Sequence, residues 1–112
     1  MPNFKQGDVI KDPSPYTDRS TRQYRPALVV SIGGIEASHQ LLWAVMITSA
    51  ENRGWPTDVA ISNHEQAGLP APSVIRTAKI ATIEVADATK LGKIPAALVK
   101  QVIGKVSREL GL

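Results

Sequence analysis

The residues best suited to chemistry in this chain gather between positions 16 and 25. They are aromatic or cationic side chains of one polar stretch: Tyr16, Arg19, Arg22, Tyr24 and Arg25. Single-stranded RNA is held by stacking of its bases on aromatic rings and by cationic contacts to its backbone, and this mixture offers both. The alternative is an ordinary polar surface loop in which Asp18 neutralises Arg19. The pattern permits a nucleic-acid site without requiring one.

Other catalytic groups are scarce. The chain has no cysteine, which excludes disulfides, thiol catalysis and cysteine-based metal sites. Its two histidines, His39 and His64, lie too far apart in sequence to form a local metal-ligand pair, and His64 fits better in a capped turn. Gly33 and Gly34 lack the strand–helix context of a phosphate loop. We therefore expect no metal site and no cofactor.

The composition is that of one basic globular domain spanning residues 1–112. Apolar residues make up 43% of the chain, which is enough for one modest core. A net charge of +3 and a pI near 9.5 are compatible with a polyanionic partner but do not demand one. The opening residues MPNFKQ lack the apolar core of a signal peptide, and no apolar stretch approaches the roughly 18 residues of a membrane span. We expect a soluble cytoplasmic protein with no membrane partner.

Short strands account for the first half of the chain. A first strand around residues 9–10 stops at Asp12, and a long polar loop follows to Tyr24. Residues 26–31 and 41–48 are continuous apolar runs rich in β-branched side chains, as expected of strands buried on both faces.

The second half adds shorter strands and one turn. Residues 57–61 alternate between apolar and polar, and residues 73–76 and 79–83 form two further strands. Residues 62–65 (SNHE) have capping-box spacing, and Gly68 can end the short helical turn that this spacing predicts.

The C-terminal segment changes to a helical period. Apolar residues recur at every fourth position and form one helical face: Leu98, Val102, Val106 and Leu110. Pro95 suits the first turn of this helix and Gly111 its end. Several short strands followed by one packing helix predict the α+β class, with a small, strongly curved antiparallel barrel.

Several segments, in order and with matching spacing, resemble the MazF/PemK family of toxins. They are residues 7–10 (GDVI) and 25–30 (RPALVV), 15–19 (PYTDR), 45–49 (VMITS), 68–75 (GLPAPSVI) and 91–94 (LGKI). The last segment, with the helix that follows it, is similar to the family's entry into its C-terminal helix. The resemblance covers nearly the whole chain.

This resemblance implies a small SH3-like antiparallel barrel of the CcdB/PemK type with a C-terminal packing helix, assembled as a homodimer. It implies the toxin of a type II toxin–antitoxin system, a metal-independent endoribonuclease that inhibits growth by cleaving single-stranded RNA, chiefly mRNA. It further implies a cognate acidic antitoxin that blocks the site. Any contact with DNA is expected only through that antitoxin.

By resemblance, the catalytic residues are Arg25 and Thr48. A guanidinium can bind a scissile phosphate and stabilise its pentacoordinate state, while a threonine hydroxyl can donate to a phosphate oxygen. The 2′-hydroxyl of the RNA would attack the adjacent phosphorus and leave a 2′,3′-cyclic phosphate and a 5′-hydroxyl. From residue type alone, a solvated arginine and a threonine selected for β-propensity remain open.

Further RNA contacts are expected from the tyrosines and arginines of the 16–24 stretch and from Ser49, Arg76 and Lys79. Ser49 suits simple turn chemistry equally well, and Arg76 suits a surface salt bridge. Ala78 stands where many family members carry a carboxylate, so no general base is identified. Trp55 is either a stacking platform or a ring packed against the core.

Two rival functions remain open. A CcdB-like gyrase poison shares the fold, but that family's pattern puts a tryptophan near the C-terminus, where this chain ends ELGL. A catalytically degenerate family member would bind RNA or antitoxin without cutting, which would agree with Ala78. An RNA-cleavage assay on the isolated protein separates the three functions.

Overall fold

The computed structural model describes residues 4–12, 25–33, 35 and 40–112. Its strands are β1 (Asp8–Asp12), β2 (Arg25–Val29), β3 (Leu41–Ser49), β4 (Asp58–Ala60), β5 (Ser73–Glu84) and β6 (Thr89–Lys93). Two short 3-10 helices, η1 (Ala50–Asn52) and η2 (Val85–Asp87), follow β3 and β5, and the helix α1 (Ala96–Glu109) ends the chain. Tyr16, Arg19, Arg22, Tyr24 and His39 lie outside the described residues.

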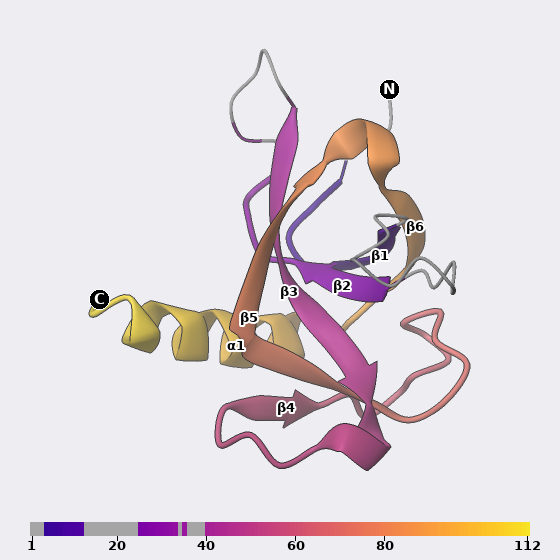
Figure 1. Cartoon of the computed structure of the whole chain (residues 1–112), viewed down its shortest axis with the longest axis vertical. Helices are drawn as coiled ribbons and strands as arrows, with labels where there is room; N and C mark the ends of the chain where they lie inside the picture. The colour runs from indigo at the N-terminus through magenta and orange to yellow at the C-terminus, as the bar shows by residue number, and fades with distance from the viewer. Residues whose placement is uncertain (1–3, 13–24, 34, 36–39) are drawn as a thin grey trace, which may run out of the picture.

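The six strands form one antiparallel sheet in the order β4-β5-β3-β2-β1-β6. The sheet curves strongly, with the two long strands β3 and β5 at its centre (Figure 1). This order leaves β4 and β6 as the two edges, so the barrel is open between them. The predicted α+β class, a curved antiparallel sheet with one C-terminal helix, is confirmed.

The loop after β4 crosses β6 at the open side of the barrel. The N–H of Lys93 donates to the carbonyl of Gln66 at 3.3 Å. A Cβ placed on Gly68 would collide with the carbonyl group of Leu91, and one on Gly92 would collide with the carbonyl oxygen of Gln66. Gly68 also has a φ of +77°, which favours glycine. Two glycines therefore allow two backbones to cross in direct contact.

Two apolar cores lie on opposite faces of the central strands. Side chains of β1, β2 and β3 alternate between them, because neighbouring strand residues point to opposite faces. Val9, Leu28 and Val45 pack in one core with Val102 of α1. The other core includes the side chains of Phe4, Ile10, Ala27, Val29, Leu42, Ala44, Met46, Ile83 and Val85. Burial on both faces explains the continuous apolar runs of residues 26–31 and 41–48.

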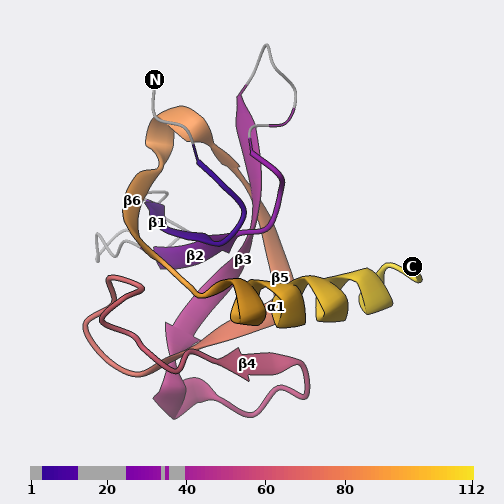
Figure 2. The same ribbon diagram turned by 180° about the vertical axis from the view of Figure 1, so that it is seen from behind.

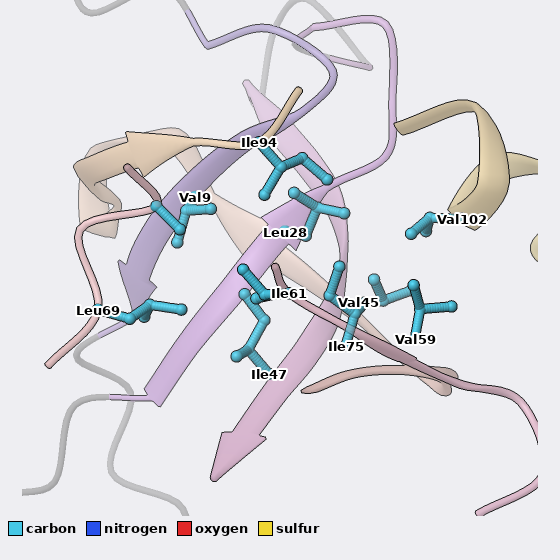
Figure 3. Packing of buried hydrophobic residues seen from close by; sticks show 11 residues of the cluster. Val9, Leu28, Val45, Ile47, Val59, Ile61, Leu69, Ile75, Ile94 and Val102 are labelled. Atoms are coloured by element: carbon cyan, nitrogen blue, oxygen red, sulfur yellow. The ribbon is translucent and has the colours of Figure 1, made fainter. Parts of the chain in front are cut away.

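The helix α1 covers the first of these cores. Figure 2 shows it lying across the sheet, and Figure 3 shows Val102 approaching the cluster that surrounds Leu28 and Val45. The partly buried side chains of Leu98, Val99 and Val106 complete the contact. The helix starts after Pro95 and is followed by Gly111 at φ +80°, as the sequence predicts. Leu110, expected on the same apolar face, is 64% exposed and does not pack on this core.

Three local features differ from the sequence predictions. Residues 73–76 and 79–83 are not two strands but one, since β5 runs through them with a bulge opposite Val45 and Met46. Residues 91–94 precede the helix, as the resemblance implies, but residues 91–93 belong to a strand that the sequence does not predict, β6, which pairs with β1. The turn after β4 is capped by the side-chain oxygen of Asn63, which accepts from the N–H of Gln66 at 3.1 Å, rather than by Ser62.

Candidate functional site

A cleft of about 610 Å³ opens where β3 ends and β5 begins. Its floor comes from β2 and β3, and one wall is the proline-rich loop that leads into β5. The lining residues are Lys11, Arg25, Pro26, Met46, Ile47, Thr48, Ser49, Asn52, Gly68, Leu69, Pro70, Ala71, Pro72, Ser73, Arg76, Lys79 and Leu91. The cleft thus draws on segments that are far apart in the sequence.

All the described residues that the sequence singles out for RNA line this cleft: Arg25, Thr48, Ser49, Arg76 and Lys79. The β2–β3 register, in which Ala27 pairs with Met46, brings Arg25 level with Thr48 when it is continued by two residues. The β3–β5 pair has a bulge between Arg76 and Ile80 of β5. Arg76 borders this bulge, Lys79 lies within it, and both residues line the cleft. Figure 1 shows the bend of β5 at this point.

The described residues that bracket residues 13–24 pair with each other beside the cleft. These residues, Asp12 and Arg25, are cross-strand partners in the β1–β2 pair. Lys11 and Arg25 both line the cleft. The chain therefore leaves and re-enters the described structure at the rim of the site.

Arg76 is held by several contacts at once. Its Nε donates to Oδ1 of Asp58 at 3.2 Å and its Nη2 to Oδ2 of Asp58 at 3.0 Å, which is a two-point ion pair. Its Nη2 also donates to the backbone carbonyl of Asn52 at 2.6 Å. Hydrogen bonding by Arg76 holds the pKa of the Asp58 carboxyl below its ordinary value, and Asp58 in turn raises the pKa of Arg76. Arg76 is thus a braced cation at one side of the cleft.

Trp55 supports this bracing rather than lining the cleft. The guanidinium carbon of Arg76 lies 4.0 Å from the centroid of its ring. Such stacking is favourable because the cation sits against the electron-rich face of the indole. The ring is 45% exposed. It is therefore packed neither in the core nor against the cleft, but on Arg76.

The two hydroxyl residues at the end of β3 differ in their bonding. Thr48 is partly buried, and its Oγ1 accepts a hydrogen bond from Nδ2 of Asn52 at 3.0 Å. Ser49 is exposed and its Oγ accepts from the N–H of Glu51 at 3.3 Å, which caps η1. Ser49 therefore combines a place in the cleft with the turn chemistry that its residue type suggests.

The cleft is cationic. Four of its described lining residues carry a positive charge, Lys11, Arg25, Arg76 and Lys79, and none of the described lining residues is a carboxylate or a histidine. A concave surface with this charge attracts a polyanion. Two of its members, Lys11 and Asn52, are not identified from the sequence. Lys11 reaches the site because it pairs with Pro26, and Asn52 because η1 folds back beside Thr48.

Within residues 4–12, 25–33, 35 and 40–112, no three histidine, aspartate or glutamate side chains come together as metal ligands would. No helix in that part of the chain has the length and apolar character needed to cross a membrane.

Comparison with known proteins identifies the family. The family model described as PemK-like, MazF-like toxin of type II toxin–antitoxin systems matches residues 5–110. The chain belongs to this toxin family. The match extends from before β1 almost to the end of the chain, so it includes every described residue of the cleft.

Solved structures of MazF-like proteins have the same fold. A MazE–MazF complex from Deinococcus radiodurans matches with a TM-score of 0.77 at 23% identity, covering 100% of this chain and 99% of that one. MazF from the same organism gives 0.74 at 24% identity, with 100% of both chains covered. An endoribonuclease in complex with its cognate antitoxin, from Mycobacterial species, gives 0.71 at 22% identity, covering 97% and 96%. A comparison with curated protein sequences gave no match.

Proposed function

We propose that this toxin is an endoribonuclease that cleaves single-stranded RNA in the cleft at the end of β3. The observation that carries the proposal is the meeting of Arg25 and Thr48 with Arg76 and Lys79 in one cationic cleft. An extended RNA strand presents one phosphate per nucleotide, which suits a row of cations better than a single-point anion site. The similar solved structure described as an endoribonuclease in complex with its cognate antitoxin supports the same activity.

The proposed reaction is a transesterification within the RNA. The 2′-oxygen attacks the adjacent phosphorus, the bond from phosphorus to the 5′-oxygen breaks, and the products are a 2′,3′-cyclic phosphate and a 5′-hydroxyl. Arg25 stabilises the charge that develops on the phosphorane, and the Thr48 hydroxyl donates to one of its non-bridging oxygens. The nucleophile belongs to the substrate, so its proximity to phosphorus supplies much of the rate, and we propose that no metal takes part.

Few of the described cleft residues are suited to transfer the protons of this reaction. An arginine is a poor general base because its pKa exceeds about 12. Ala78 replaces the carboxylate found in many family members, and the described lining residues hold no other carboxylate or imidazole. We therefore assign the acceptor of the 2′-proton to none of them. For the departing 5′-oxygen, we propose that Arg25 helps to protonate it.

Binding of the flanking nucleotides is proposed for the remaining predicted residues. Ser49, Arg76 and Lys79 would contact phosphates from within the cleft, since all three line it. The same role is proposed for Tyr16, Arg19, Arg22 and Tyr24, which would hold bases and backbone. Their segment is joined to Asp12 and Arg25, which pair with each other, and Arg25 lines the cleft.

We also propose a cytoplasmic homodimer that is inhibited by an acidic antitoxin. A MazE–MazF complex and an endoribonuclease bound to its cognate antitoxin are among the structural matches. An acidic segment fits the charge of the cleft. For the dimer, Trp43 and Ile80 are 51% and 52% exposed and are diagonal neighbours, since Ile80 pairs with Val45. Such exposed apolar neighbours favour burial against a second copy.

The test of this function is RNA cleavage by the purified protein and two arginine variants. Arg25→Ala should abolish cleavage without loss of fold, because the side chain is exposed and flanks the core. Arg108→Ala is the matched control, since it removes the same charge from the exposed end of α1, away from the cleft. Equal activity of both variants would refute the site. Binding without cleavage by the wild-type protein would instead favour a degenerate family member.

A further inference from the structure

Thr48 can assist the reaction only if its hydroxyl hydrogen points toward the RNA. A threonine hydroxyl rotates about its C–O bond and can donate one hydrogen bond and accept two. An unrestrained hydroxyl would spend part of its time donating to neighbouring protein atoms or solvent. Some group must therefore restrict the rotation, and the contacts around Thr48 identify it.

We propose that Asn52 is a positioning residue for Thr48, and that Arg76 anchors Asn52. The proposal deepens the function given above and rests on it. Asn52 Nδ2 donates to Thr48 Oγ1 at 3.0 Å, so one lone pair of the hydroxyl oxygen is occupied on that side. The hydroxyl hydrogen must then point elsewhere, and Thr48 and Asn52 both face the cleft. The amide thus leaves the donor of Thr48 available to a phosphate oxygen.

The position of Asn52 is itself fixed through its backbone. Its carbonyl oxygen accepts from Arg76 Nη2 at 2.6 Å, and Arg76 is held in place by both carboxylate oxygens of Asp58 and by the face of Trp55. Asp58 and Arg76 are also cross-strand partners in the β4–β5 pair. The contacts therefore form a continuous series from the edge strand of the sheet to the hydroxyl of Thr48.

The start of η1 is tied down as well. Ser49 caps it, and the N–H of Ala50 donates to the carbonyl of Pro72 at 3.0 Å. η1 is thus attached to the proline-rich wall of the cleft on one side and to Arg76 on the other. A three-residue 3-10 helix has little stability alone, so these attachments determine where the Asn52 side chain lies.

Asn52 can position the Thr48 hydroxyl for RNA only if its Nδ2, and not its amide oxygen, faces Thr48. If its oxygen faced Thr48, the hydroxyl hydrogen would be consumed by the amide and lost to the substrate. Asn52→Asp creates that situation, because a carboxylate only accepts. We expect Asn52→Asp to lower kcat more than Asn52→Ala, which merely releases the hydroxyl. Position 52 is exposed, aspartate matches asparagine in size and alanine only removes atoms, so both variants should keep the fold.

A double-mutant cycle tests the proposal, using single-turnover cleavage by wild type, Asn52→Ala, Thr48→Val and the double variant. If Asn52 acts through Thr48, Asn52→Ala lowers kcat about tenfold with little change in KM, as expected for one weakened hydrogen bond in the transition state. In the Thr48→Val background the same substitution then has no effect. An equal loss in both backgrounds would overturn the proposal, because Asn52 would then contact the RNA directly or support the fold.

A second readout does not depend on activity. The side-chain amide of Asn52 gives its own ¹⁵N–¹H signals, and Thr48→Val should shift them and speed their exchange with water. Thr89→Val, at an exposed strand residue outside the cleft, should leave them unchanged. If Thr48→Val left the chemical shifts and exchange rates of the Asn52 amide unchanged, the positioning role would be overturned, whether or not the protein cuts RNA. Inactive wild-type protein with the expected amide shift would refute the proposed function but leave the Asn52–Thr48 pair intact.

Discussion

Replacement of Thr48 by valine isolates the contribution of one hydroxyl to the reaction. The substitution keeps the β-branched shape that β3 favours and removes a single donor. Its partner Asn52 is exposed, so water can replace the lost bond, and the free energy of unfolding should change by about 1 kcal/mol or less. A change of activity can then be separated from a change of fold.

The size of the effect follows from the charge of the phosphorane. A hydrogen bond to a charged group contributes about 1.5–3 kcal/mol, and about 1.4 kcal/mol corresponds to a factor of ten, so kcat should fall roughly ten- to a hundredfold. The measurement is single-turnover cleavage of a fluorogenic RNA, alongside thermal unfolding of the same preparations. Thr89→Val serves as the control. A kcat equal to wild type in a folded Thr48→Val protein would show that Thr48 is a strand residue only.

Two further predictions concern the ion pair and the dimer. The lowered pKa of Asp58 means that its stabilising effect is fully present above about pH 4, the ordinary value of an unfolded aspartate, and is lost as the pH falls through its lower folded value. The melting temperature of Asp58→Asn should therefore lie below that of wild type at pH 6 and approach it in acid; a difference independent of pH would contradict this. Ile80→Lys should shift the protein toward monomer in sedimentation at micromolar concentration, because it puts a charge among exposed apolar side chains; a wild-type monomer would refute the dimer itself.

Elements with a strong local pattern are predictable from this sequence. The apolar runs of β2 and β3, and the apolar residues at every fourth position of α1, are visible within each segment alone. The structure confirms these three elements. β6 is different: residues 89–93 contain two lysines and a glycine, and nothing in that run resembles a strand. Its conformation comes from pairing with β1, more than seventy residues earlier in the chain. Tertiary contact, rather than local propensity, decides such a segment.

The residues of the candidate site, too, are predictable from the sequence only in part. Arg25 and Thr48 can be named from motifs, because the resemblance assigns a role to each position. Lys11 and Asn52 cannot, since each reaches the cleft through a feature that no motif records: the β1–β2 register and the fold of η1. The residue type of Trp55 does not predict which contact its ring makes. Neither stacking in the cleft nor burial in the core describes a ring whose contact is Arg76.

The central claim is that the 2′-hydroxyl of the RNA is the nucleophile in this cleft. The most direct test is an RNA oligonucleotide with a single deoxyribose at the scissile linkage, compared with the all-RNA strand in the presence and absence of EDTA. We predict that the deoxy substitution abolishes cleavage while binding persists, that EDTA has no effect, and that the all-RNA products carry a 2′,3′-cyclic phosphate and a 5′-hydroxyl. Cleavage of the deoxy linkage, or a 5′-phosphate on the downstream product, would contradict the mechanism, because a metal-activated water would then be the attacking group.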